Sequence, residues 1–245
     1  MKYEEIAAAL GLDPKADTEA AKVLDGLVEE VDGKRIKTVL HGACVIVFGA
    51  GPSLKDDLGR IKAAGLQKSC ALIAAGGAIK ALLEEGIVPH IHVTDLDGDA
   101  HATAEANRGG TITVVHAHGD NVELIRDQVP RLRGVLGTTQ TPAFGRLRNF
   151  GGFTDGDRAA YLADHFGAKT IALAGMDFGT TIGQYSGSRD AGFTRKKLRV
   201  GEKLLEELAE KKRNRIVNLT AKGAELTGIP RTSIEELRAS ATHRK

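Results

Sequence analysis

Three aspartates crowd the end of one apolar run in this chain of 245 residues. The stretch IHVTDLDGD places Asp95, Asp97 and Asp99 within five residues. Two carboxylates about 4 Å apart repel each other by roughly 4 kcal/mol at an effective dielectric constant near 20, so a cation usually offsets such crowding. An extended strand end aims Asp95 and Asp97 to the same side. The pair predicts a magnesium site, because Mg²⁺ binds one or two carboxylates together with waters and substrate phosphates.

A turn is the alternative explanation of the same stretch. Asp97-Gly98 is a common turn pair, and Asp99 is a good N-cap for a following helix. We expect Asp99 to cap that helix in either case. For Asp95 and Asp97 both explanations stay open at this point.

A glycine-rich turn, GAGPSL, leads from a predicted strand into a predicted helix. Its glycines let the backbone approach a ligand, and the N–H groups at a helix start can bind an anion. The turn lacks the ending of a Walker A loop and the third glycine of a dinucleotide fingerprint. A plain tight turn is the alternative. We predict that phosphate groups bind to Gly49, Ala50, Gly51, Pro52 and Ser53.

The stretch GGFTDGDRA predicts a second phosphate-binding segment at a helix start. Thr154 at the N-cap and Asp157 three residues later form a shortened capping box. Capping does not explain Asp155 and Arg158, which follow two glycines, where an acid can meet a metal and an arginine a phosphate. We predict Thr154 and Arg158 at the phosphate site.

Basic residues begin a later helix, directly after the Gly/Ser-rich stretch GQYSGSRDAGF. Loops of that composition often close over a substrate. A solvated charged face is the alternative. We predict that Lys196 and Lys197 neutralise phosphate charge.

The stretch HAHGDN has the His-x-His-x-Asp spacing that certain zinc hydrolases use. A catalytic zinc ion needs three protein ligands, and the other histidines of the chain are scattered. We favour imidazoles that hydrogen-bond at a pocket wall, with Asp120 or Asn121 capping a helix. Asp120 is also a candidate general base.

Short β-rich runs alternate with longer helical patterns from residue 44 onward, which predicts an α/β fold with a Rossmann-like, doubly wound, mostly parallel sheet. Residues 1–40 predict a separate helical segment, with Thr18 capping a helix through Val23, Leu27 and Val31. Residues 41–245 would form the catalytic domain with a C-terminal helix and tail. The predicted strands are Cys44–Phe48, Ala71–Ala75, His90–Thr94, Thr111–His116, Arg133–Thr138, Thr170–Ala174 and Ile216–Leu219. The predicted helices are Leu54–Ala64, Ala78–Glu85, Ala100–Asn107, Asn121–Gln128, Asp155–Phe166 and Arg195–Lys211.

Right-handed crossovers bring the carboxyl ends of parallel strands to one edge of a sheet, where ligands bind. Residues that follow the predicted strands should therefore meet at that edge. They predict a substrate pocket containing Gly76, Gly77, His116, His118, Asn121 and Asp177.

Composition limits the classes of partner. The net charge is +2 with 27% charged residues, which predicts neither a nucleic acid nor a membrane surface as partner. Cys44 and Cys70 each open an apolar run and are expected to be small buried residues, as suits a reducing cytoplasm. No run approaches the roughly 20 apolar residues of a membrane span. We expect a soluble cytoplasmic protein, and a homo-oligomer is compatible with the sequence.

Two long segments resemble thiamine diphosphokinases. ALIAAGGAIKALLEEGIVPHIHVTDLDGD resembles their strand, small-residue turn, helix and strand ending in Asp-x-Asp. FTDGDRAAYLADHFGAKTIALAGMDFG resembles their second signature. The whole set, with FGAGPSL, HAHGDN and TRKKLRVGEKLLEEL, resembles more closely the archaeal 6-hydroxymethyl-7,8-dihydropterin diphosphokinases of the MptE-like family, over about residues 40–220.

This resemblance implies that ATP and 6-hydroxymethyl-7,8-dihydropterin react to AMP and the pterin diphosphate, with Mg²⁺, on a route to tetrahydromethanopterin or folate. It also implies Asp155 as a metal ligand beside Asp95 and Asp97, while the pterin contacts stay unassigned. A metal-dependent nucleotide-sugar glycosyltransferase is one alternative, because it uses the same Asp-x-Asp pattern. A non-catalytic nucleotide-binding protein and a zinc hydrolase are the others.

Overall fold

A computed structural model describes residues 1–30, 33–187, 191–211 and 215–241. These residues form a seven-stranded parallel sheet in the order β5-β4-β3-β2-β1-β6-β7. Nearly every strand residue is buried, as expected when helices cover both faces of a parallel sheet. The strands are β1 Cys44–Phe48, β2 Ala71–Ala75, β3 Ile91–Thr94, β4 Ile112–Ala117, β5 Leu136–Thr139, β6 Thr170–Ala174 and β7 Arg215–Asn218.

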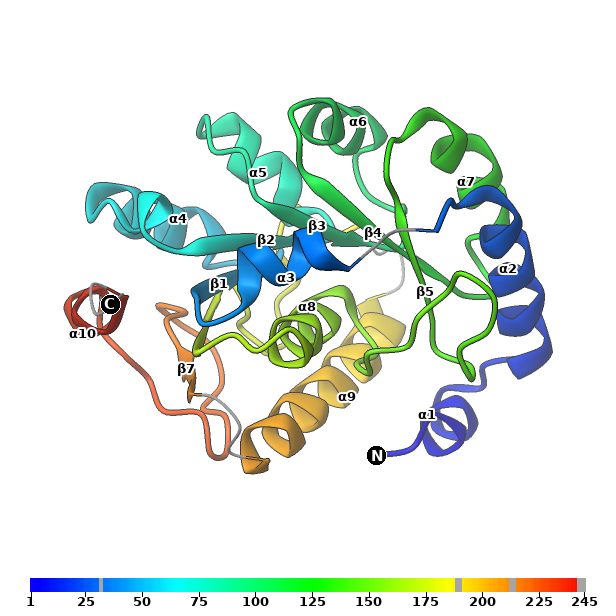
Figure 1. Ribbon diagram of the computed structural model, residues 1–245. Coiled ribbons are helices and arrows are strands. Elements are labelled where there is room, and N and C mark those ends of the chain that lie inside the picture. The colour runs from blue at the N-terminus through cyan, green and yellow to red at the C-terminus, as the bar shows by residue number, and fades with distance from the viewer. Residues whose placement is uncertain (31–32, 188–190, 212–214, 242–245) are drawn as a thin grey trace.

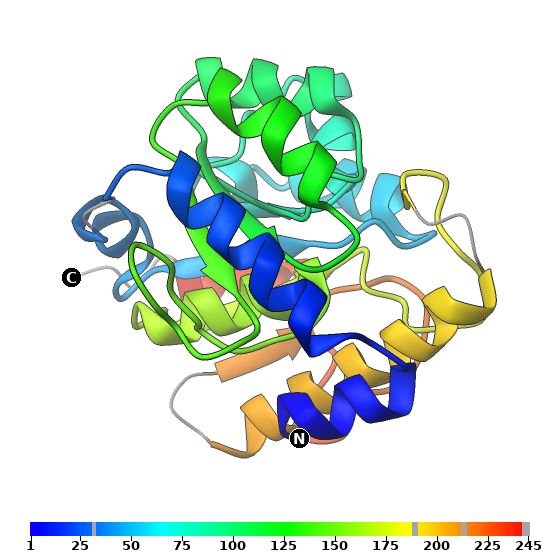
Figure 2. The same cartoon turned by 90° about the vertical axis from the view of Figure 1, so that its right-hand side faces the viewer.

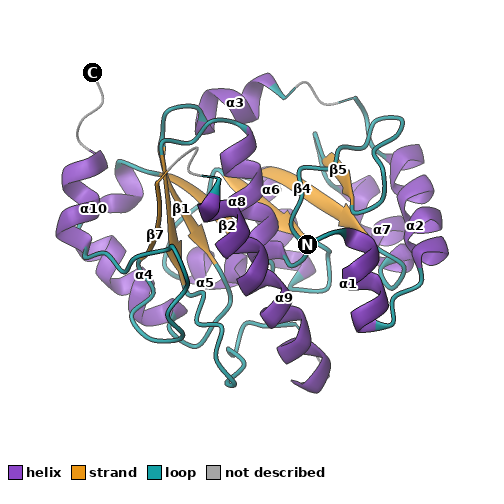
Figure 3. Cartoon of the chain, turned by 90° about the horizontal axis from the view of Figure 1, so that it is seen from below, coloured by secondary structure: helices purple, strands orange, loops and turns teal. Residues whose placement is uncertain are grey.

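Helices cover the sheet on two sides (Figure 1). Helices α4 to α7 lie on one face, and α8 and α9 cross the other, as the view from below also shows (Figure 3). The α-helices are α1 Tyr3–Leu10, α2 Pro14–Leu27, α3 Lys34–Leu40, α4 Leu54–Ala63, α5 Ala78–Glu84, α6 Ala100–Arg108, α7 Val122–Gln128, α8 Asp155–His165, α9 Ala191–Glu210 and α10 Ile234–Ala241. No helix of the described residues is long and apolar enough to span a membrane.

The order of the strands places a switch point between β1 and β6. From β1 the chain moves outward through β2, β3, β4 and β5, and it then returns to add β6 and β7 on the other side of β1. The chain therefore leaves β1 and β6 toward helices on opposite faces of the sheet, and the crevice outside the carboxyl ends of these two strands is the usual ligand position in such sheets. The predicted doubly wound α/β fold is confirmed.

Helix α2 packs beside the β5 edge of the sheet (Figure 2). Helix α2 contacts β4, β5 and α7, and α1 contacts α9. The prediction that Thr18 caps this helix was wrong. Asp13 is the N-cap and Pro14 the first helical residue, while the Thr18 hydroxyl donates to the Pro14 carbonyl inside the helix. Val31 of the predicted helix lies outside the described residues.

The C-terminal tail, for which no helix was predicted after Lys211, contains α10. Ser233 and Glu236 cap this helix reciprocally, with the Glu236 amide donating to Ser233 Oγ and the Ser233 amide to Glu236 Oε2. A serine followed three residues later by glutamate is a capping-box signal that was present in the sequence. Residues 242–245 lie outside the described part of the chain.

Candidate active site

A cavity of about 440 Å³ lies at the carboxyl edge of the sheet. The loops after β1, β2, β3, β4 and β6 form its wall, together with the starts of α8 and α9 and the link between α1 and α2. Most of the predicted site residues line it: Gly49, Ala50, Gly51, Pro52, Gly76, Gly77, Asp95, Asp97, His116, His118, Asp120, Thr154, Asp155, Arg158, Asp177 and Lys197.

Three predicted site residues lie outside the cavity wall. Lys196 is exposed on α9. Ser53 is buried, and both its hydroxyl and its amide donate to the Asp177 carboxylate. Asn121 is buried behind the wall, where its side-chain nitrogen donates to the carbonyl oxygens of Asp95 at 2.8 Å and His116 at 2.7 Å. Asn121 thus joins the loops after β3 and β4 rather than contacting a ligand.

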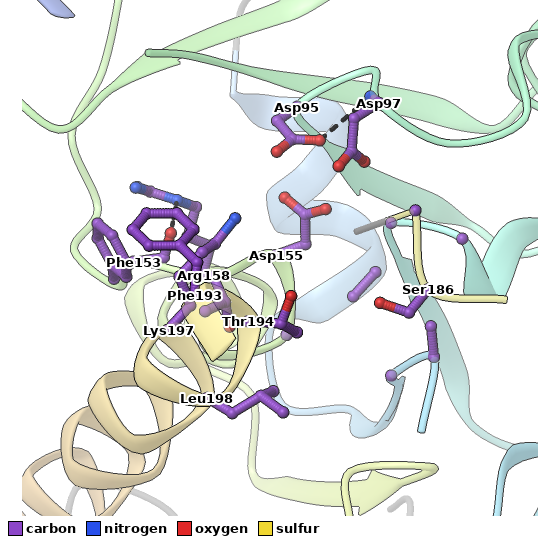
Figure 4. Close-up of a pocket in the computed structure, with 18 of the residues that line it drawn as sticks. Asp95, Asp97, Phe153, Asp155, Arg158, Ser186, Phe193, Thr194, Lys197 and Leu198 are labelled. Carbon is purple, nitrogen blue, oxygen red and sulfur yellow. Dashed lines mark hydrogen bonds between the residues drawn. The ribbon is translucent and has the colours of Figure 1, made fainter. Parts of the chain in front are cut away.

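The carboxylates of Asp95, Asp97 and Asp155 point toward one another across the cavity (Figure 4). Desolvation and the charge of Asp95 raise the pKa of Asp97 to about 7. Desolvation, followed by the charges of Asp95 and Asp97, also raises the pKa of Asp155 well above its ordinary value. The crowding therefore favours the protonated form of two of the three carboxyl groups in the absence of a cation.

Asp95 is the member of this group that remains ionised. His118 Nε2 lies 3.2 Å from Asp95 Oδ2, and the Asp120 amide donates to His118 Nδ1 at 3.3 Å. Because Nδ1 accepts, Nε2 carries the proton of the neutral ring and donates to Asp95. Burial acts to raise the pKa of Asp95, but the hydrogen bonds to His118 and Asp97 outweigh it and hold the pKa below its ordinary value.

The backbone between the two aspartates is strained. Leu96 has a φ of 71°, in the left-handed region that a non-glycine residue rarely adopts. Its amide donates to Thr94 Oγ1 at 2.9 Å and its carbonyl accepts from Gln128 at 3.1 Å, which holds this conformation. The extended geometry predicted for Asp95 and Asp97 was therefore wrong, and a left-handed turn places both carboxylates in the cavity. Asp99 caps α6 as expected, accepting from the Ala102 amide at 3.0 Å.

The start of α8 presents donors to the cavity. Thr154 and Asp157 form the predicted capping box. The amides of Asp155 and Gly156, at the first two helical positions, have no hydrogen-bond partner among the described residues. Free amides at the positive end of a helix dipole are suited to bind a phosphate group. Lys197 of α9 also lines the cavity.

Three backbone amides of the glycine loop after β1 are already bonded within the protein. The amide of Gly49 donates to Ala174 O at 2.9 Å, that of Gly51 to Gly175 O at 2.8 Å, and that of Ser53 to Asp177. The predicted binding of phosphate through these amides is corrected on this point. Asp177 already occupies the start of α4 with its own carboxylate.

The glycines of this loop serve close packing against the loop after β6. A Cβ atom at Gly51 would lie 2.2 Å from Asp177 Oδ2 and 2.5 Å from Gly175 O. Gly76 and Gly77 after β2 have a similar role, since a Cβ atom would lie 2.7 Å from Asp155 Oδ2 and 1.7 Å from Tyr185 O respectively. These residues bring loops close enough together to shape the cavity.

Several residues of the cavity wall were not predicted as site residues. The link between α1 and α2 contributes Leu12, and the first turn of α2 contributes Ala16. Gln140 directly follows β5, and Phe153 and Phe193 lie before α8 and at the start of α9. The pair Asp13-Pro14 is a helix-start signal that could have located the link in the sequence. No local signal shows that the link reaches the cavity.

Asp17 connects this link to the rest of the site. Its buried carboxylate accepts from the Gly119 amide at 2.7 Å, from Gln140 Nε2 at 2.7 Å and from the Tyr3 hydroxyl. The loop after β4, the end of β5 and α1 are thereby tied to one side chain on α2.

Asp17→Ala is expected to lower the free energy of unfolding by about 2–3 kcal/mol, because it leaves buried donors without an acceptor. Asp13→Ala is the matched control, since Asp13 accepts from the Lys15 amide at an exposed N-cap and its loss costs about 1 kcal/mol. Urea denaturation of both variants measures the difference. Equal losses would contradict the connecting role of Asp17.

The described residues contain no group of three or more His, Cys, Asp or Glu side chains arranged to hold a metal ion. The zinc interpretation of HAHGDN therefore lacks support. His116 Nδ1 lies 3.2 Å from Thr138 Oγ1 and His118 is engaged with Asp95. The histidines hydrogen-bond in the pocket wall, as favoured from the sequence.

The fold and the cavity define a class: an α/β protein with a doubly wound sheet and an acidic cavity at the carboxyl ends of its strands. Residues 19–183 match the family model described as "6-hydroxymethylpterin diphosphokinase MptE-like". The chain belongs to this family.

Three relatives share the name 6-hydroxymethyl-7,8-dihydropterin pyrophosphokinase. The chain is 45% identical to that of Methanocaldococcus jannaschii over 193 residues, covering 75% of this chain and 80% of the relative. It is 48% identical to that of Methanothermobacter thermautotrophicus over 185 residues, covering 75% and 79%. It is 41% identical to that of Pyrococcus furiosus over 227 residues, covering 89% and 96%.

A solved structure, the MAf glycosyltransferase from Magnetospirillum magneticum AMB-1, has a similar fold. The TM-score is 0.51 at 17% identity, over 91% of this chain and 41% of that chain. At this identity the likeness concerns the fold alone. It does not favour the glycosyltransferase alternative over the function in the names of the three much closer relatives.

Proposed function

We propose that the protein is a 6-hydroxymethyl-7,8-dihydropterin diphosphokinase that transfers diphosphate from ATP to the pterin hydroxymethyl group and releases AMP. The observation that carries this proposal is the family membership, with relatives of that name at 41–48% identity. The facing carboxylates of Asp95, Asp97 and Asp155 and the free amides at the start of α8 lie in one cavity wall, which supports the proposal because transfer of a phosphate group needs both a cation site and anion-binding donors.

Asp95, Asp97 and Asp155 would hold Mg²⁺ only together with oxygen atoms of the triphosphate, because among the described residues these side chains are not by themselves arranged to hold a metal ion. Carboxylate oxygens are hard ligands that suit this ion, and a site with few protein ligands leaves positions for phosphates and waters. The raised pKa values of Asp97 and Asp155 support the fit, since they reflect negative charge that a cation would offset. When bound, Mg²⁺ supplies charge neutralisation and fixes the phosphate oxygens.

The chain's own residues position the phosphates. The amides of Asp155 and Gly156 would bind phosphate oxygens at the start of α8. Lys197 would neutralise charge from the facing helix, and His118 holds Asp95 in place by a hydrogen bond of 3.2 Å. Lys196, which is exposed outside the cavity, is not part of this proposal.

The reaction is an in-line displacement at the β-phosphorus of ATP. The pterin hydroxymethyl oxygen forms a bond to this phosphorus while the bond to the oxygen bridging the α- and β-phosphates breaks, and AMP departs with that oxygen. The hydroxymethyl proton leaves to a base or to water. Asp120, which is exposed at the wall of the cavity, would pass this proton to solvent. Alignment and charge stabilisation supply most of the rate enhancement.

The proposal predicts that AMP, and not ADP, accumulates with ATP, Mg²⁺ and 6-hydroxymethyl-7,8-dihydropterin. Chromatographic separation of the nucleotides measures this. EDTA should abolish the product, and omission of the pterin should leave ATP intact. Formation of ADP would indicate an ordinary kinase. Binding of ATP without turnover would favour the non-catalytic nucleotide-binding alternative. A melting temperature that rises with a nucleotide sugar but not with ATP would favour the glycosyltransferase alternative.

A further inference from the structure

The cavity differs in character on the two sides of its aspartates. Toward the crevice between β1 and β6 it is lined by glycines and backbone, including Gly49, Gly51 and Gly175. The other side, here called the His116 half, consists of His116, Gln140, Phe153, Arg158, Leu12 and Ala16. Figure 4 shows Phe153 and Arg158 on one side of Asp155 and Ser186 on the other.

His116 presents an unused hydrogen-bond acceptor in this half. Its side chain is only 2% exposed, and Nε2 has no partner within the described part of the chain. The Thr138 hydroxyl donates its one proton to Val115 O at 3.0 Å, so at His116 Nδ1, 3.2 Å away, it can only accept. Nδ1 therefore carries the ring proton and Nε2 can only accept, with the Gln140 side chain as a polar neighbour of the ring. Burial and the charge of Arg158 lower the pKa of His116, which keeps the ring neutral.

Arg158 presents an unused donor in the same half. It is 6% exposed, with Nε donating to Phe153 O at 3.0 Å and Nη2 to Gln140 Oε1 at 2.9 Å. Gln140 is fixed in turn, since its Nε2 donates to Asp17 at 2.7 Å. Nη1 has no hydrogen-bond partner in the described ranges. The cavity wall of the His116 half thus contains a donor, Arg158 Nη1, and an acceptor, His116 Nε2, on buried side chains that hydrogen bonds hold in place.

The N-terminal link closes this half of the cavity. A Cβ atom at Gly119 would lie 2.7 Å from Ala16 Cβ, so α2 packs directly on the loop after β4. Leu12 and Ala16 add apolar surface, and Phe153 adds an aromatic ring. A small flat heterocycle gains from apolar contact on its faces and from directed hydrogen bonds at its edge.

We propose that the His116 half binds the pterin ring of the acceptor substrate. His116 Nε2 accepts a hydrogen bond from a ring N–H or the 2-amino group, and Arg158 Nη1 donates to the ring carbonyl oxygen. The inference rests on the proposed function. With phosphates at the aspartates and at the start of α8, the nucleotide extends into the β1–β6 crevice, where nucleotides usually bind in such sheets. The His116 half is then left for the acceptor, with its hydroxymethyl group directed toward the aspartates.

His116→Leu tests the placement because it removes the acceptor and keeps an apolar side chain. The Kd of 6-hydroxymethylpterin, measured by fluorescence titration, is expected to rise about 10- to 100-fold, the effect of leaving a buried donor unpaired. The Kd of magnesium α,β-methylene ATP should change by less than about 2-fold. His116→Gln should restore part of the pterin affinity, since the amide oxygen can accept in place of Nε2.

His92→Leu is the matched control. His92 is also a buried strand histidine with an unpartnered ring nitrogen in the described residues, but it does not line the cavity. Its replacement is expected to change thermal stability and to leave the pterin Kd unchanged.

Each outcome bears on a different claim. Equal pterin affinity in wild type and His116→Leu would overturn the ring placement and leave the proposed function standing. If His116→Leu weakens binding of the ATP analogue and not of the pterin, the adenine would lie in the His116 half, and the proposed ring placement would again be overturned. A wild-type protein that binds no pterin would contradict the proposed function itself. If His116→Leu does not fold, the wild-type protein is titrated instead with a pterin that is methylated at N3 and at the 2-amino group. A Kd equal to that of the unmethylated pterin would overturn the placement.

Discussion

Asp97→Asn is expected to lower turnover by at least about 100-fold while the protein without metal or nucleotide stays as stable as wild type or becomes more stable. Asp97 faces Asp95 and Asp155 in the cavity, so the substitution removes a proposed cation ligand and at the same time a like-charge repulsion. AMP production and thermal melting in EDTA measure the two effects. Near-normal turnover would show that Asp97 is not a ligand of the proposed cation. Loss of folding would show that Asp97 serves only the turn after β3.

The same substitution should alter the dependence of stability on pH. The pKa of Asp97 is raised from 3.8 to about 7, so between about pH 4 and 7 the folded state binds more protons than the unfolded state. Stability of the metal-free protein therefore falls as the pH rises through this range. Asp155 shifts in the same direction and adds to the slope. In Asp97→Asn the free energy of unfolding should change less steeply between about pH 4 and 7. An unchanged slope would show that the titration of Asp97 does not cause this dependence.

Gly51→Ala is expected to reduce stability and activity together. The added Cβ atom would lie 2.2 Å from Asp177 Oδ2 and 2.5 Å from Gly175 O, so the loops after β1 and β6 must separate. Overpacking of this kind lowers the free energy of unfolding by about 1–3 kcal/mol. Displacement of the two loops should also lower turnover by at least about 10-fold, because it disturbs the alignment of the substrates. Chemical denaturation and the AMP assay measure both losses.

Gly59→Ala is the control for this prediction. Gly59 is exposed inside α4, and a Cβ atom there meets nothing within 4 Å. Alanine favours a helix interior over glycine by about 1 kcal/mol, so this variant should be slightly more stable and fully active. A Gly51→Ala variant that behaves like Gly59→Ala would show that the close approach of the two loops is not required.

The strands and helices of the α/β core could be predicted because each depends on a local pattern. Strands β1, β2 and β6 begin and end where the sequence indicates, since short apolar runs bounded by glycine or polar residues are typical of buried parallel strands. The edge strand β5 begins at Leu136, three residues after the predicted start at Arg133. Val135 before it is apolar and buried, so the apolar pattern does not mark the start of this strand; the start is set by pairing with β4, which begins with Leu136 opposite Val114.

The site residues could be predicted as a group for a related reason. Parallel strands with right-handed crossovers bring all carboxyl ends to one edge, so residues after β1, β2, β3, β4 and β6 meet whatever their separation in sequence. The conformation of each loop could not be predicted. Leu96 adopts a left-handed conformation because Thr94 and Gln128 hold it, and Gln128 lies 32 residues away.

Sequence by itself determined the doubly wound sheet, the edge at which the acids gather and the family, because periodicity, crossover handedness and motif order are properties of the chain. Only the tertiary structure decided which groups are free to bind a ligand. The Gly51 and Ser53 amides are occupied by Gly175 and Asp177, and Asp17 ties α2 to Gln140 across 123 residues. The physical reason is that a donor or acceptor can bind a ligand only when no distant part of the chain already forms a hydrogen bond with it. The local sequence does not identify those distant partners.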